Sequence, residues 1–128
     1  MRVLLDTHTL LWWLADDERL SAAARTTIGD PTIEILVSAA SAWEIATKVR
    51  TGKLPNHAGI AADLPQHLAS QGFTPLAITV EHAQRAGSLP GSHRDPFDRM
   101  LIAQAHADAV PLVSNDTVFD GYGVLRLW

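Results

Sequence analysis

Short apolar runs alternate along this chain with longer segments in which apolar residues recur at helical spacing. Arg2–Leu5 and Ile33–Val37 are short and rich in aliphatic or β-branched residues, which favours buried strands. Similar runs predict three more strands, over Phe73–Leu76, Val110–Val113 and Val124–Leu127. The segments between them predict helices over Thr9–Ala15, Ser21–Ile28, Ala40–Arg50, Gly59–Ser70, Glu81–Gly87 and Pro96–Ala107.

This alternation predicts an α/β fold, because strands that alternate with helices form a parallel sheet covered on both faces. Gly52 ends the helix that runs to Arg50, and Pro65 predicts an irregularity within Gly59–Ser70. The chain has 128 residues, a common size for one domain, and contains no repeat or linker. We therefore expect a single domain over residues 1–128, with any ligand at the carboxyl ends of the strands.

The composition narrows the class of protein. A hydrophobic fraction of 47% and a charged fraction of 19% are typical of a globular domain. The absence of cysteine excludes disulfides and thiolate zinc sites and fits a reducing compartment. Asp6 interrupts the first apolar stretch, and no apolar run is long enough to span a membrane. We expect a cytoplasmic protein that does not bind membranes.

The net charge of −4 is unusual for a nucleic-acid-binding protein, because most such proteins are basic. A nuclease that gathers carboxylates around metal ions is an exception, since the bound cations reverse the local charge. The net charge therefore neither supports nor excludes a protein that acts on nucleic acid.

Four acidic residues stand where predicted strands lead into helices. Asp6 follows the first strand, and Glu44 lies in the first turns of the helix after the second strand. Asp98 lies in the first turn of the Pro96 helix, and Asp116 follows the strand that ends at Val113. Because the carboxyl ends of parallel strands meet at one edge of the sheet, all four can converge there.

Each acid also has a purely structural interpretation. Asp6 and Asp116 can cap the helices that follow them, and Ser41–Glu44 fits a capping box. Asp95 fits an N-cap, with proline at the first helical position and Asp98 facing the helix dipole. Taken singly, capping is the favoured interpretation for each of these residues.

Taken together, the four carboxylates favour a metal site. Like charges at one edge repel and raise each other's pKa unless a cation lies between them. Oxygen ligands without cysteine suit Mg²⁺ or Mn²⁺. Such a site can activate water and stabilise an in-line displacement at phosphorus, which is the chemistry of phosphodiester cleavage.

The same residues carry a family resemblance that extends in order over nearly the whole chain. Met1–His8 resembles the first strand and aspartate of PIN domains, and Val37–Ile45 resembles the second motif of VapC-type toxins. His93–Ala105 is similar to the third motif of one VapC-like subgroup, and it is the most specific of the four. Leu112–Asp116 resembles the fourth motif, a hydroxyl residue two positions before an aspartate.

The resemblance implies a three-layer α/β/α fold and a metal-dependent endoribonuclease, the toxin of a type II toxin–antitoxin pair. It further implies an RNA substrate, neutralisation by a VapB-like antitoxin, and a homodimer. Its acidic residues correspond here to Asp6, Glu44, Asp98 and Asp116, as catalytic residues and ligands of Mg²⁺ or Mn²⁺. Ser114 stands where threonine is common, and Asn115 stands where a small or acidic residue is common. Asp95 leaves the third motif ambiguous, and we assign the metal to Asp98.

Several neighbouring residues have both a functional and a structural interpretation. His93, Arg94 and Arg99 can contact phosphate or form local ion pairs with Asp95 and Asp98. The remaining candidates share weaker signals. Thr7 and Ser114 can hold a metal-bound water.

Three basic residues and three tryptophans have weaker signals. The basic residues can guide RNA or form a polar helix face: Lys48, Arg50 and Lys53. The tryptophans can stack on bases, but a position in the core or at a subunit interface is favoured: Trp12, Trp13 and Trp43. A structural role is also favoured for His8.

Two other functions compete with this interpretation. The first is a phosphatase with Asp6 as nucleophile, but Asp6–Thr9 lacks the second aspartate that such enzymes use as acid and base. The second is a PIN-like domain that processes or binds RNA without a toxin role. The presence of all four acids favours a domain that cleaves.

Overall fold

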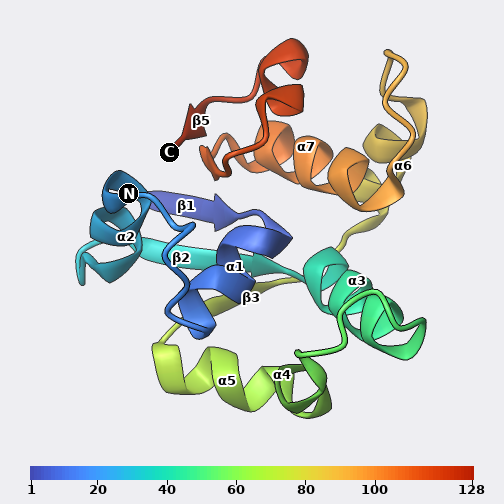
Figure 1. The fold of residues 1–128 in the computed structure, drawn as a ribbon. Helices are drawn as coiled ribbons and strands as arrows, with labels where there is room; N and C mark the ends of the chain where they lie inside the picture. The colour runs from blue at the N-terminus through green and yellow to red at the C-terminus, as the bar shows by residue number, and fades with distance from the viewer.

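The computed structural model describes all 128 residues, and a five-stranded parallel sheet forms its centre (Figure 1). The order across the sheet is β3-β2-β1-β4-β5, and every neighbouring pair is parallel. The strands are β1 (Arg2–Leu5), β2 (Glu34–Ser38), β3 (Thr74–Leu76), β4 (Leu112–Val113) and β5 (Arg126–Leu127). The predicted parallel sheet is confirmed; β1 has the predicted bounds, β2 is shifted by one residue, and β3, β4 and β5 are shorter than the apolar runs that indicated them.

Successive apolar side chains of the central strands point to opposite faces of the sheet, so a hydrophobic core forms on each face. Leu4 of β1 pairs in register with Leu36 of β2 and Leu112 of β4, and all three face the core on the α7 side of the sheet. Val3 and Leu5 point to the opposite face, because successive side chains of a strand alternate. Both faces are apolar, which explains why the strands appear in the sequence as continuous hydrophobic runs.

Helices cover both faces and make a three-layer α/β/α arrangement, as the fold prediction required. In Figure 1, α6 and α7 lie on one side of the sheet, and α1, α4 and α5 lie on the other. The helices are α1 (Thr7–Leu14), α2 (Ala22–Gly29), α3 (Ala39–Arg50), α4 (Ala58–Ala62), α5 (Leu64–Gln71), α6 (Val80–Ser88) and α7 (Pro96–Asp108). None of these helices is long and apolar enough to cross a membrane.

Two elements differ from the prediction. The helix expected over Gly59–Ser70, with an irregularity at Pro65, is two helices, because Asp63 leaves the helical conformation and separates α4 from α5. The Asp63 carboxylate accepts a hydrogen bond from the Gln66 N–H, and Pro65 then fits the first turn of α5. The sequence patterns also missed η1 (Thr117–Tyr122), a short 3₁₀-helix with Asp116 as its N-cap.

The capping box proposed for Ser41 and Glu44 is also wrong. Ser38 caps α3 instead, and its hydroxyl accepts a hydrogen bond from the Ala40 N–H at 3.0 Å. Ser41 is therefore inside the helix, where its hydroxyl accepts a hydrogen bond from Thr7. This frees the Glu44 side chain from any capping role.

Candidate active site

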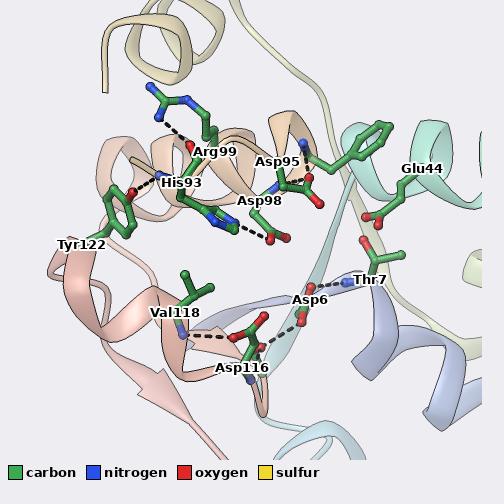
Figure 2. Close-up of polar contacts among 12 residues, drawn as sticks. Asp6, Thr7, Glu44, His93, Asp95, Asp98, Arg99, Asp116, Val118 and Tyr122 are labelled. Atoms are coloured by element: carbon green, nitrogen blue, oxygen red, sulfur yellow. Dashed lines mark hydrogen bonds and ion pairs between the residues drawn. The ribbon is translucent and has the colours of Figure 1, made fainter. Parts of the chain in front are cut away.

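The four predicted carboxylates lie at the edge of the sheet where the strands end. The arrow of β1 points towards the side of the molecule where α3 and α7 begin (Figure 1). Asp6 follows β1, Glu44 comes from α3, Asp98 from the first turn of α7, and Asp116 from the segment after β4 (Figure 2). The fold therefore brings residues from four separate segments to one place.

Asp6 is the most constrained of the four. Its side chain caps α1, with one oxygen accepting from the Thr7 N–H at 2.7 Å and the other from the Ser114 hydroxyl at 2.8 Å. The residue is 6% exposed, and burial raises its pKa although the Ser114 hydrogen bond opposes that rise. The carboxylate is thus held rigidly between the ends of β1 and β4.

Asp98 lies opposite Asp6 and is paired with a histidine. His93 Nε2 lies 2.8 Å from Asp98 Oδ2, and both side chains are largely buried (Figure 2). Burial raises the pKa of Asp98 to about 6, while the His93 hydrogen bond lowers it and the charges of Asp95 and Asp6 raise it further. A cation at this position would relieve the repulsion among these carboxylates.

Glu44 is held by a lysine from its own helix. The residue is 4% exposed, and its carboxylate forms an ion pair with the ammonium of Lys48 one helical turn later. Although burial lowers the pKa of Lys48, the hydrogen bond to Glu44 and the charges of Asp95 and Asp98 raise it above its ordinary value. The lysine therefore places a positive charge among the site's carboxylates.

Asp116 is the exposed member of the group. Its carboxylate caps η1 by accepting from the Val118 N–H at 3.0 Å, as the capping interpretation predicted. Its own N–H donates to the Ser114 hydroxyl, which in turn donates to Asp6. Ser114 thus links the first and fourth acids and orients the Asp6 carboxylate.

Asp95 serves as the N-cap of α7, as its sequence context indicated. Its carboxylate accepts from the backbone N–H groups of Phe97 at 2.9 Å and Asp98 at 3.2 Å. The same oxygen receives both bonds, so the carboxylate is turned towards the helix end. This geometry favours Asp98 over Asp95 as the residue that faces the site.

The segment before α7 is tied down by a side chain whose role the sequence did not indicate. Arg99 donates to the carbonyl oxygens of Ala86 at 3.1 Å and His93 at 3.0 Å, and also to that of Leu89. The Tyr122 hydroxyl accepts from the His93 N–H at 3.0 Å. Arg99 and Tyr122 therefore position His93 against Asp98, and Tyr122 has no local motif that could have revealed this.

The remaining candidates are the tryptophans, His8 and Thr7, and they differ in how deeply they are buried. Trp12 and Trp13 pack against the hydrophobic core, as the structural interpretation predicted. Trp43 is 60% exposed, so a core position for it is wrong. His8 is exposed, with its ring 6.0 Å from that of Trp12, and its charge lowers the pKa of the neighbouring Asp6. Thr7, which is buried, donates to Ser41 and thereby joins α1 to α3.

The donor set suits a hard divalent cation, because four carboxylates and no sulfur or imidazole cluster converge on this edge. As the side chains stand, no three acidic or histidine residues are close enough to hold a metal ion together. Glu44 forms an ion pair with Lys48, and Asp98 forms a hydrogen bond with His93. A cation that binds Glu44 therefore competes with Lys48 for its carboxylate.

Comparison with known proteins places these features in a family. Residues 3–125 match the family described as PIN domain. The chain is 32% identical over 117 residues to Ribonuclease VapC22 of Mycobacterium tuberculosis, covering 89% of this chain and 86% of that protein. Its fold is similar to the Mycobacterium tuberculosis Sarcin-Ricin loop cleaving toxin VapC20, with a TM-score of 0.72, 15% identity and 96% of each chain covered. It is also similar to Rickettsia felis VapBC2 bound to a promoter DNA fragment, with a TM-score of 0.69, 15% identity, and 98% and 97% covered.

Proposed function

This chain belongs to the PIN-domain family, and we propose that it is a metal-dependent endoribonuclease, the toxin of a type II toxin–antitoxin pair. The observation that carries the proposal is the gathering of Asp6, Glu44, Asp98 and Asp116 at one sheet edge. Two of these carboxylates, Asp6 and Asp98, have a raised pKa there because of burial. The relative VapC22 is a ribonuclease by name, and the similar VapC20 is a toxin that cleaves the Sarcin-Ricin loop.

Asp6 and Asp98 are the principal ligands in this proposal, and Mg²⁺ or Mn²⁺ is the expected metal. When bound, such a cation supplies Lewis-acid polarisation of a phosphate and activation of water. Asp6 is preorganised by Ser114, and Asp98 by the N-terminal turn of α7. Glu44 and Asp116 complete the negative potential that attracts the cation, Asp116 from the solvent-exposed side.

Lys48 and His93 are the side chains that contact Glu44 and Asp98. They come from the two segments that frame the site, α3 and the loop before α7. There they can contact the phosphates of a single-stranded RNA, which carries one negative charge per nucleotide.

Arg94 is the second candidate for an RNA contact, whereas Arg99 acts through the loop that it holds. Arg94 is exposed and forms no ion pair or hydrogen bond in the structure. Arg99 uses Nε and both terminal nitrogens on backbone carbonyl oxygens, so its role is to position His93. Arg50 and Lys53 are exposed near the end of α3 and extend the positive surface away from the carboxylates.

A toxin of this kind needs an inhibitor, and a VapB-like antitoxin is the expected partner. The similar VapBC2 structure from Rickettsia felis contains both halves of such a pair, as its name states. An arginine of the antitoxin can bind Asp6, Glu44, Asp98 or Asp116 bidentately and so compete with the metal. A homodimer is the expected assembly of the toxin.

The toxin role is tested by inducing the chain in cells without its partner and sequencing the ends of cellular RNAs. We expect growth arrest and new RNA ends from the wild type, neither from Asp6→Asn, and rescue by the small protein encoded beside it. Growth arrest by Asp6→Asn would contradict the nuclease mechanism. Cleavage by a chain that never harms the cell would favour an RNA-processing enzyme, and RNA binding without cleavage would favour a binding domain.

A further inference from the structure

Beside the carboxylates lies a recess that the proposed chemistry does not use. It is an apolar space of about 200 Å³ between α3, α6 and α7, and its walls include Trp43, Ile78, Phe97 and Met100. Trp43 packs edge-on against Phe97, with ring centroids 4.9 Å apart and planes at 75°. An exposed tryptophan fixed by a perpendicular ring presents a flat, rigid face to solvent.

A polar hollow of about 480 Å³ adjoins this apolar recess. The two spaces share Gly87 and Arg99 in their walls, so they lie on either side of these two residues. The polar hollow is lined by the segment that leads into α7, including Ser92, His93 and Arg94, and no acidic side chain lines it. It carries the guanidinium groups of Arg94 and Arg99, of which that of Arg94 has no partner in the protein.

The two halves together complement one kind of ligand. An apolar recess with an aromatic wall accepts a planar base, and a cationic hollow without carboxylates accepts an anion. A nucleotide of single-stranded RNA offers both groups on one unit. A helix of a protein partner would fill the apolar half but would leave the positive half without a counterion.

The position of these spaces also fits a nucleic acid that passes the carboxylates. Trp43 directly precedes Glu44 in α3, and Phe97 directly precedes Asp98 in α7. His93 lines the polar hollow and is bonded to Asp98 (Figure 2). A nucleotide in the two spaces therefore lies next to the residues that we propose to cleave its neighbour.

We propose that this recess and hollow form a nucleotide subsite, in which a base of the RNA stacks on Trp43 and an adjacent phosphate binds Arg94. The proposal rests on the proposed ribonuclease function and specifies how the substrate is held. Stacking tolerates every base, so the subsite supplies affinity and register more than sequence preference. Gly87 lies where the two spaces meet, and a Cβ added there would enter open space with no atom within 4 Å.

The test measures binding of a fluorescein-labelled oligouridylate in the Asp98→Asn background, where the RNA stays intact. Trp43→Leu should weaken binding about tenfold, the loss of one stacked base, and Trp43→Phe should largely restore it. Gly87→Leu should place a large side chain where the two spaces meet and weaken binding similarly. Gly59→Leu is the matched control, because Gly59 is also a helical glycine with open space around it, and it should bind as the parent does.

A second measurement follows the salt dependence of the same binding. Arg94→Ala should reduce the slope of log affinity against log salt by about 0.7, the value for one phosphate contact to a single strand, and Arg94→Lys should keep the slope. Unchanged affinity in Trp43→Leu and Gly87→Leu would overturn the subsite, as would a loss of antitoxin binding without loss of RNA binding. A wild type that binds RNA through Trp43 but never cleaves it would refute the proposed function and leave the subsite intact.

Discussion

Replacing Asp98 by asparagine should stabilise the metal-free protein while it abolishes RNA cleavage. The Asp98 side chain is 17% exposed, and burial raises its pKa from 3.8 to about 6. The ionised carboxylate is thus held in a place that disfavours its charge. Asparagine keeps the size and can still accept the hydrogen bond from His93 Nε2, but it carries no charge.

Linkage between protonation and folding determines whether Asp98 raises or lowers the free energy of unfolding as the pH changes. Below about pH 4 the carboxyl is protonated in both the folded and the unfolded chain, and its contribution to stability is fully present. Between about pH 4 and 6 the unfolded chain ionises first, so the wild type loses stability as the pH rises. Above about pH 6 the loss is complete and amounts to at most about 3 kcal/mol.

The assay is urea unfolding of wild type and Asp98→Asn in EDTA across this pH range. The difference in unfolding free energy should grow in favour of Asp98→Asn from about pH 4 to 6 and then level off. Glu18→Gln, an exposed side chain without a partner, removes the same charge and is the control that should show no such growth. Mg²⁺ should then stabilise only the wild type, by about 2.7 kcal/mol at a concentration 100 times its Kd.

Two outcomes would refute this reasoning. If Asp98→Asn is less stable than the wild type at pH 7 in EDTA, the ionised Asp98 contributes favourable contacts that outweigh its burial. If Mg²⁺ stabilises both proteins equally, Asp98 is not a ligand. The second result would shift the assignment of the metal ligand towards Asp95.

Other predictions concern the residues around the site. Asp95→Ala should lower the unfolding free energy by about 0.5–2 kcal/mol through loss of the α7 cap, measured by urea unfolding, and should leave cleavage detectable. A dead Asp95→Asn beside an active Asp98→Asn would reverse the two roles. Gly91→Ala should lower both Tm and activity, because φ is +108° and the new Cβ would lie 2.6 Å from the Tyr122 hydroxyl. An unchanged Tm in Gly91→Ala would show that this segment accommodates a side chain without strain. Binding of the antitoxin should weaken as salt rises and when its arginines are replaced one at a time, measured by calorimetry, whereas salt-independent binding would exclude the electrostatic route.

The sequence indicated those parts of the site that depend on local pattern. Asp6 and Asp98 were recognisable because each stands at a fixed position between an apolar run and a helix, where main-chain geometry alone determines where the side chain lies. Lys48 could have been identified as the partner of Glu44 from the spacing of four residues on one helix. The parallel sheet followed from the alternation of strands and helices.

The contacts that hold the site together were beyond the sequence because they join distant segments. Ser114 bonds Asp6 across 108 positions, and Tyr122 bonds the His93 backbone across 29. Only the packed fold determines which of the many possible hydroxyl partners is near. The irregularity expected at Pro65 lies at Asp63 instead, because a capping residue inside a helical pattern competes with continuation of the helix by only a small difference in free energy.

Cleavage of RNA by the purified chain in the presence and absence of divalent metal tests the central claim most directly. The account predicts cleavage of single-stranded RNA in Mg²⁺ or Mn²⁺, none in excess EDTA, recovery when the metal is restored, and none by Asp6→Asn that is folded by circular dichroism. Cleavage that persists in EDTA, or that is equally strong in Asp6→Asn, would contradict it.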